Sequence, residues 1–132
     1  MTTTIIKGDL IIDNEMAYNG DLIVRGNILG KNNYIYNLTV NGSINARNIH
    51  AWNISAKNIT AKNITARNIT AFNIKAENIT ARGDINTWDI KAKNIIYYAV
   101  CFAYYNIKCK SIKGTRDNAR HFVLDGKIEA ME

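Results

Sequence analysis

The feature that most constrains this chain is a five-residue repeat that runs from Ile44 to Ile95. Each unit reads isoleucine, variable, alanine, variable, asparagine, as in ITAKN and ITARN. In an α-helix a step of five residues turns the chain by about 500°, so the isoleucines would wind around the helix and leave no apolar face. In one straight strand an odd step would place successive isoleucines on opposite faces of the sheet. The repeat therefore fits neither element alone.

A coil of very short strands does accommodate the repeat. Isoleucine and alanine point inward on each short strand, and a corner at the variable–asparagine pair turns the next isoleucine inward again. Asparagine suits this corner because it tolerates left-handed backbone geometry and its amide can bond to nearby main chain. Stacked coils would lie about 4.8 Å apart and enclose columns of isoleucine and alanine. We therefore predict an all-β chain folded as a β-solenoid with five to six residues per side.

The repeat leaves the number of sides open, and three or four are both compatible with it. With four sides, Trp52 would stack on Phe72 and Lys57 on Glu77. With three sides, Trp52 would stack on Arg67 and Lys57 would stack on Phe72.

We expect residues 1–132 to form a single domain with three parts. Residues 8–43 repeat a Gly-Asp-Leu-Ile phrase at spacings that suit six-residue sides, with a loop near 31–37 that carries Tyr34 or Tyr36. Residues 44–95 form the regular five-residue coils. Residues 96–132 form an irregular aromatic coil, and His121 to Ile128 are expected to close it as a final hairpin or cap.

Two resemblances accompany these patterns. The five-residue period resembles that of the pentapeptide-repeat proteins, which implies a right-handed, four-sided β-helix, although the large and small inward residues are in reversed order here. The phrase GDLIVRGNI at residues 20–28 resembles the opening of the bactofilins, which implies end-to-end polymerisation. Some pentapeptide-repeat proteins inhibit DNA topoisomerases as acidic mimics of DNA. This chain has a net charge of +6, so that activity is not carried over.

Signatures of catalysis, metal binding and membrane insertion are weak. The sequence has no serine-histidine-acid pattern, no phosphate-binding glycine loop and no paired carboxylates, so we expect no enzymatic activity and no cofactor. The spacing of Cys101 and Cys109 favours buried structural cysteines over a metal site that would also use His121 and Asp125. Without an apolar run of eighteen residues or a leader-like start, we expect a cytoplasmic protein with no membrane contact.

Two surfaces are candidate binding sites. At the position after the inward alanine, basic residues alternate with aromatics, which suits phosphate backbones and bases if the residues share one face, and a solvated surface if they lie on all sides. The tyrosines near the C-terminus suit a dimer contact or a docking surface, or else cap the core of the last coil. The basic and aromatic face comprises Arg47, Trp52, Lys57, Lys62, Arg67, Phe72, Arg82, Trp88 and Lys93, and the tyrosine surface comprises Tyr97, Tyr98, Tyr104 and Tyr105.

These features predict a non-enzymatic scaffold that binds a protein partner or a second copy of itself. A first alternative is nucleic-acid or nucleotide binding, as in a small inhibitor protein of a phage or mobile element, because residues 44–95 carry eight Lys or Arg against three Asp or Glu. A second alternative is self-assembly into bactofilin-like filaments.

Overall fold

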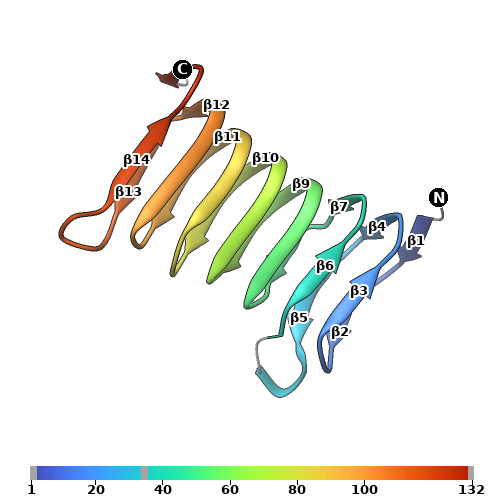
Figure 1. Ribbon diagram of the computed structural model, residues 1–132. Coiled ribbons are helices and arrows are strands. Elements are labelled where there is room, and N and C mark those ends of the chain that lie inside the picture. The colour runs from blue at the N-terminus through green and yellow to red at the C-terminus, as the bar shows by residue number, and fades with distance from the viewer. Residues whose placement is uncertain (1–2, 34–35, 131–132) are drawn as a thin grey trace.

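The computed structural model describes residues 3–33 and 36–130, most of which lie in β-strands. All of the strands belong to one 15-stranded sheet, and every paired strand runs parallel to its neighbour. The sheet winds into coils that stack along one axis, with the two ends of the chain at opposite ends of the stack (Figure 1). The predicted β-solenoid is therefore confirmed.

The strands align on three faces that run along the stack. Face 1 consists of β1 (Thr3–Ile6), β4 (Asp21–Val24), β7 (Ser43–Asn45), residues 58–61, 73–76, 89–92 and 106–109, and β15 (Ile128–Ala130). Face 2 consists of β2 (Leu10–Ile12), β5 (Asn27–Gly30), β8 (Asn48–His50), residues 63–66, 78–81 and 94–97, and β13 (Ser111–Gly114). Face 3 consists of β3 (Met16–Tyr18), β6 (Leu38–Val40), residues 53–56, 68–71, 85–87 and 100–103, and β14 (Arg120–Val123). Four long strands bend through corners and contribute to several faces: β9 (Asn53–Ala66), β10 (Asn68–Ala81), β11 (Ile85–Tyr97) and β12 (Val100–Cys109).

The register of the strands shows that each regular coil has three sides. Ile59 pairs with Ile74, fifteen residues later, and Ile74 pairs with Ile90, sixteen residues later. Three sides of five residues account for the first spacing. As expected for three sides, Trp52 lies beside Arg67, whose guanidinium carbon is 4.9 Å from the centroid of the indole ring. The four-sided coil implied by the resemblance to pentapeptide-repeat proteins is therefore not formed.

The interior consists of the predicted columns of isoleucine and small residues. Each of the eleven isoleucines of the repeat is at most 2% exposed. Burial of one such side chain contributes about 1.5–3 kcal/mol, which offsets part of the entropy lost when the short strands become ordered. Thr87 replaces an inward alanine and is also buried, because its hydroxyl donates hydrogen bonds to the carbonyl oxygens of Phe72 and Asp89.

The asparagines of the repeat form hydrogen-bonded columns along the stack. On face 2, the Nδ2 atom of Asn63 donates to Oδ1 of Asn48 at 2.8 Å, and Asn78 and Asn94 continue the column. Among the described non-glycine residues only Asn32 has a positive φ. The prediction that the asparagines of the repeat adopt left-handed backbone geometry is therefore wrong. Equivalent columns on faces 3 and 1 are Asn37–Asn53–Asn68 and Ser43–Asn58–Asn73. Asparagine is thus used for its amide side chain and not for its backbone freedom.

In the N-terminal coils, aspartate performs the bridging role of asparagine. The Oδ1 atom of Asp21 accepts a hydrogen bond from the backbone amide of Ser43 at 2.9 Å, and Asp9 does the same for Asn27 at 2.7 Å. A Cβ atom added at Gly42 would collide with the carboxylate of Asp21, so the close approach of these coils requires glycine. The Gly-Asp phrases are thereby explained as links between coils.

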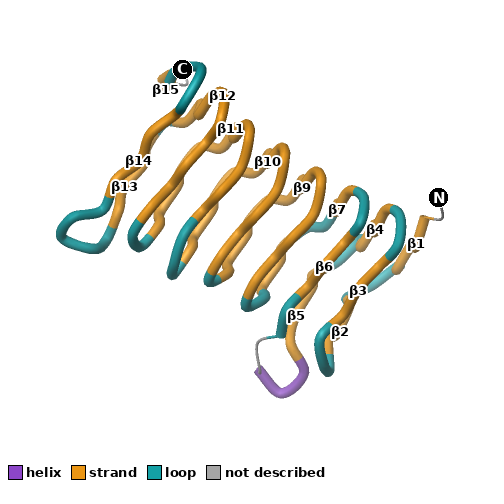
Figure 2. Tube along the Cα trace, in the orientation of Figure 1, coloured by secondary structure: helices purple, strands orange, loops and turns teal. Residues whose placement is uncertain are grey.

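The N-terminal coil has the longer sides that were predicted, because Leu10 pairs with Ile28, eighteen residues later. The predicted loop follows β5 and begins with a short 3-10 turn, η1 (Lys31–Asn33), which projects from the stack in Figure 2. Tyr36 is half-buried and packs against the core, and Tyr34 lies outside the described residues. The described residues include no helix that is long and apolar enough to cross a membrane.

The C-terminal strands form a further parallel coil and not a hairpin, which was one of the two expected endings. Strand β14 pairs with β12 through Cys101 and His121, twenty residues apart, and β15 pairs with β12 through Ile107 and Ile128, twenty-one residues apart. Both pairs are parallel, whereas the strands of a hairpin would be antiparallel. The loop between β13 and β14 extends away from the stack (Figure 1).

Candidate functional site

Because each coil turns three corners, the variable corner residues stack into three columns. Each column has a composition of its own. Edge 1–2, between faces 1 and 2, carries Arg47, Lys62, Glu77, Lys93 and Lys110. Edge 2–3 carries Trp52, Arg67, Arg82, Tyr98 and Arg116. Edge 3–1 carries Lys57, Phe72, Trp88, Tyr104 and Tyr105. Edge 1–2 is therefore mainly basic, edge 2–3 mixes arginine with aromatics, and edge 3–1 is mainly aromatic.

The predicted basic and aromatic face is not one surface, because positions five residues apart fall on successive edges of a three-sided coil. Its nine residues divide equally among the edges. Arg47, Lys62 and Lys93 lie on edge 1–2, Trp52, Arg67 and Arg82 on edge 2–3, and Lys57, Phe72 and Trp88 on edge 3–1.

Edge 3–1 carries a continuous row of aromatic side chains. The ring centroids of Phe72 and Trp88 are 5.1 Å apart, and those of Trp88 and Tyr104 are 5.6 Å apart. A register shift in β12 places Tyr105 opposite Trp88 as well, with its ring edge-on to the indole at 5.6 Å. Phe72 and Trp88 nevertheless remain 50% and 46% exposed. The rings stabilise one another along the row and still present an apolar edge to solvent.

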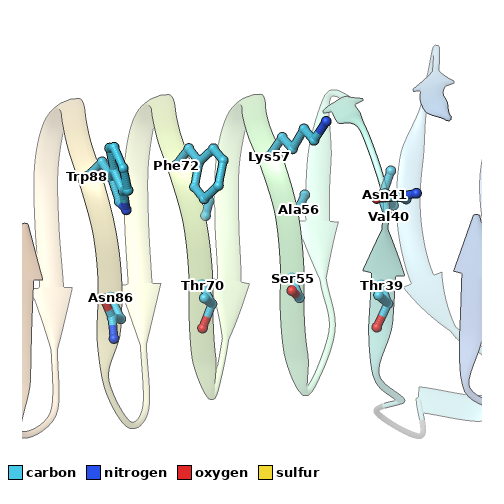
Figure 3. A pocket seen from close by; sticks show the side chains of 11 residues that line it. Thr39, Val40, Asn41, Ser55, Ala56, Lys57, Thr70, Phe72, Asn86 and Trp88 are labelled. Atoms are coloured by element: carbon cyan, nitrogen blue, oxygen red, sulfur yellow. The ribbon is translucent and has the colours of Figure 1, made fainter. Parts of the chain in front are cut away.

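A shallow groove of about 460 Å³ runs beside this row, along face 3. Figure 3 shows two parallel lines of side chains that border it. One line is neutral and polar and consists of Thr39, Ser55, Thr70 and Asn86. The other follows the edge and consists of Asn41, Lys57, Phe72 and Trp88. Hydroxyl and amide groups next to exposed rings can form hydrogen bonds and apolar contacts, which are the contacts of a binding surface.

The four tyrosines of the predicted C-terminal surface lie in three different places. Tyr97 is 1% exposed, and its hydroxyl is 2.7 Å from Nδ1 of His121, so it belongs to the core and the prediction of a surface role for it is wrong. Tyr98 lies on edge 2–3, where the guanidinium carbon of Arg116 is 5.9 Å from its ring centroid. Tyr104 and Tyr105 lie together on edge 3–1, with ring centroids 4.8 Å apart. Only these last two share a surface.

Sequence reasoning missed a column of lysines on face 1. Lys75 pairs in register with Lys91, and Lys91 pairs with Lys108, so the three side chains follow one another on consecutive coils. All three are exposed. They lie in the slot between isoleucine and the inward small residue, at spacings of sixteen and seventeen residues. The sequence shows a lysine in that slot of three repeats, but these lysines can be predicted to stack only when the number of residues per coil is known.

The two cysteines are buried thiols within the core. Cys101 is 0% and Cys109 is 5% exposed, and neither forms a disulfide. Burial, together with the neighbouring Cys109, raises the pKa of Cys101 to about 12, and burial also raises the pKa of Cys109. Both thiols are therefore protonated near neutral pH and are poor nucleophiles. Among the described residues there is no group of three or more histidine, cysteine, aspartate or glutamate side chains that could hold a metal ion.

Surface chemistry is the basis for assigning a function to this chain. The two most distinctive surfaces are the aromatic row of edge 3–1 and the lysine column of face 1. Comparison of the chain with models of protein families, with curated proteins and with solved structures finds no match.

Proposed function

We propose that this protein is a non-enzymatic β-solenoid scaffold that binds a protein partner through edge 3–1. The observation that carries the proposal is the unbroken row of half-exposed rings formed by Phe72, Trp88 and Tyr104. Aromatic residues are enriched at protein interfaces and often supply most of the binding energy there. A contact that covered this row would remove apolar surface from water along several coils at once.

The apolar surface continues toward the C-terminal coil. The ring centroids of Phe102 and Phe122 are 5.1 Å apart on face 3, and Phe122 is 38% exposed. Leu124 follows that strand and is 66% exposed, and its neighbour Asp125 is bonded through its backbone amide to the carbonyl of Tyr104. A contiguous apolar surface of this kind indicates an interaction site, whereas single exposed apolar residues do not.

Stabilisation of the coils alone does not explain the row. Internal stacking uses the faces of the rings, yet about half of Phe72 and Trp88 remains in contact with solvent. At the same corner of an earlier coil the chain uses Lys57, which is compatible with the fold and avoids the exposed apolar surface. The aromatic residues are therefore a local addition to a corner that folds without them.

Size-exclusion chromatography with light scattering tests the proposal, with a second copy of the chain as the first partner. A twofold contact would pair the row with itself. We expect the wild-type protein to be a dimer and Phe72→Ser/Trp88→Ser to be a monomer with unchanged circular dichroism. Trp52→Ser is the matched control, because it removes an exposed indole from edge 2–3. If the row variant does not retain the β-solenoid spectrum, Tyr104→Ser/Tyr105→Ser tests the same edge.

If the wild-type protein is monomeric, the same variants are compared in a pull-down from cells of the native host. The proposal requires that a protein captured by the wild type and by Trp52→Ser is lost with Phe72→Ser/Trp88→Ser. Monomeric wild-type protein together with an unchanged set of captured proteins would show that edge 3–1 is only a structural feature of the coils.

Filament formation is a second candidate function, consistent with the resemblance of residues 20–28 to bactofilins. Its support is that β1, β2 and β3 at one end, and β13, β14 and β15 at the other, each pair with a strand on one side only among the described residues. Unpaired strand edges can be extended by another chain. Negative-stain electron microscopy distinguishes the two candidates, since filaments would be visible as long rods and a discrete dimer would not.

A further inference from the structure

We propose that face 1 together with edge 1–2 binds the phosphate backbone of a nucleic acid. The lysine column of face 1, Lys75, Lys91 and Lys108, lies at the centre of this surface. It is independent of the aromatic row and of the protein partner proposed for that row. We call face 1 and edge 1–2 together the basic surface.

Two parallel lines of cations form the basic surface. The lysine column continues from coil to coil at the spacing of paired strands, about 4.8 Å. Two residues further along the chain, Lys93 and Lys110 stack on edge 1–2, where the amide of Lys110 donates to the carbonyl of Lys93 at 2.8 Å. Lys62 and Arg47 extend this second line toward the N-terminus. The surface holds seven basic residues against the four acidic residues Asp21, Glu77, Asp89 and Glu129.

In the outward slots of the three faces, lysine is concentrated on face 1. Three consecutive coils place Lys75, Lys91 and Lys108 in the outward slot of face 1. The slots of the same coils on face 3 hold Thr70, Asn86 and Phe102, and those on face 2 hold Thr80, Ile96 and Lys113. Only one of these six residues is charged. Edge 2–3 carries a separate line of charge in Arg67, Arg82 and Arg116, but face 1 is the face that carries lysine in the slots of three consecutive coils.

The lysine column is unfavourable for the isolated fold. Like charges that face each other across neighbouring strands destabilise a sheet. Among the described residues the salt bridges are Lys93 with Glu77 at 3.5 Å and Lys127 with Glu129 at 3.2 Å, and neither includes a lysine of the column. Glu129 pairs in register with Lys108, so one end of the column faces an opposite charge, whereas Lys75 and Lys91 face each other. A bound anion that spans several coils would therefore relieve the repulsion that remains between the lysines.

A nucleic acid backbone suits this surface better than other anions. It is a linear polymer with one charge per residue, at an axial spacing in a duplex strand of about 3.4 Å that is comparable to the separation of the coils. Lysine contacts phosphate as a point charge without reading sequence. The neighbouring rings of Phe72, Trp88 and Tyr104 contact one another, so the ring surfaces inside these contacts are not available to bases. The inferred binding is therefore independent of sequence.

Fluorescence anisotropy with labelled single-stranded and duplex oligonucleotides tests the inference. We expect binding at low salt that weakens steeply as salt rises, with a logarithmic slope of about −5 for seven contacts to a single strand. Lys75→Gln/Lys91→Gln/Lys108→Gln should lower the affinity about 50-fold at about 0.15 M salt and make the slope shallower by about 2. Comparison of the affinities for single-stranded and duplex oligonucleotides identifies which form of nucleic acid the surface binds.

The matched control is Arg67→Gln/Arg82→Gln/Arg116→Gln on edge 2–3, which also lowers the net charge by three, from +6 to +3. The inference requires that this control keeps nearly wild-type affinity. Phe72→Ser/Trp88→Ser should also keep it, so that failure here is separate from failure of the proposed protein contact. Equal losses in both triple variants would overturn the inference, because affinity would then follow total charge. Binding of the wild-type protein to phosphatidylserine vesicles or polyglutamate, but not to oligonucleotides, would also overturn it.

Discussion

The middle coils and the last coil follow one plan but differ greatly in how well they bury their inward residues. In β9 and β10 the spacing between stacked residues is fifteen, and Ile74 is 2% exposed. In the last coil the spacing rises to twenty or twenty-one, and Ile128, in the same column as Ile74 on face 1, is 41% exposed. A coil of a solenoid is stabilised by its neighbours on both sides, and the last described coil has one. Burial therefore depends on stacking and not on the inward residue alone.

The two regions also differ in what the additional residues do. Middle coils contain little beyond the five-residue unit, so their corners hold one exposed side chain each. Thr87 of β11 pairs with Ala103 of β12, and Asp89 pairs with Asn106, so β12 has one more residue than β11 between these two pairs. The additional residue places both Tyr104 and Tyr105 at one corner. Irregularity is thus the means by which the aromatic row becomes wider toward the C-terminal end.

Core truncation gives the largest expected difference between the two regions. Ile74→Ala should lower the free energy of unfolding by about 3–4 kcal/mol, because it opens a cavity between two coils. Ile128→Ala should cost less than about 1 kcal/mol, since the side chain is already partly in water. Urea denaturation followed by circular dichroism measures both. Similar losses for the two variants would mean that the last coil is as tightly stacked as the middle.

Overfilling the interior should have the next largest effect. Ala66 is 3% exposed in β9, and leucine at this position would have to displace the neighbouring isoleucines. We expect Ala66→Leu to destabilise the protein by about 2 kcal/mol, and Ala130→Leu in the exposed β15 to change stability by less than about 0.5 kcal/mol. Thermal unfolding of the two variants provides the comparison. An unchanged stability of Ala66→Leu would indicate that the interior is wider than the structure shows.

Breaking an asparagine column should cost somewhat less. Asn63 donates to Asn48 and accepts from Asn78, both at 2.8 Å, so Asn63→Ala leaves two partners unpaired at a half-buried position. We expect a loss of about 1.5 kcal/mol. Asn41→Ala, which removes one exposed bond to Asn19, should cost less than about 0.5 kcal/mol. Equal costs in urea titrations would argue that solvent replaces the amide bonds in the middle coils as easily as at the end.

The smallest effect concerns the pH dependence that Cys101 introduces near the boundary of the two regions. Its pKa is raised in the folded state, so its contribution to stability is complete below the unfolded pKa of about 9 and is lost as pH rises toward about 12. At pH 10 the loss should be about 1 kcal/mol. Cys101→Ala should flatten the dependence of unfolding free energy on pH between about 8 and 10. An unchanged slope in this variant would assign the dependence to other groups.

The local pattern was sufficient to predict the β-solenoid, and it did not predict which surface residues share an edge. Alternation of inward and outward side chains is a property of a few consecutive residues, so the isoleucines of the repeat from Ile44 to Ile95 could be assigned to the interior. Tyr97 was assigned to the surface because it lies among other tyrosines. It is buried at the inward position of face 2, where Ala81 lies in the coil before. Gly114 pairs with Tyr97 in the next coil and leaves room for the ring, because a Cβ atom there would lie 2.9 Å from it.

The sequence by itself determined that this chain coils, that isoleucine and alanine line its interior, and that asparagine recurs at each corner. The tertiary structure decided that each regular coil has three sides. The number of sides in turn decides which outward residues are neighbours on consecutive coils. Closure depends on how consecutive coils stack and hydrogen-bond, which is a contact between residues about fifteen positions apart and leaves no trace within one repeat. Hence Phe72 and Trp88 become one row, and Lys75, Lys91 and Lys108 one column, only in the folded protein.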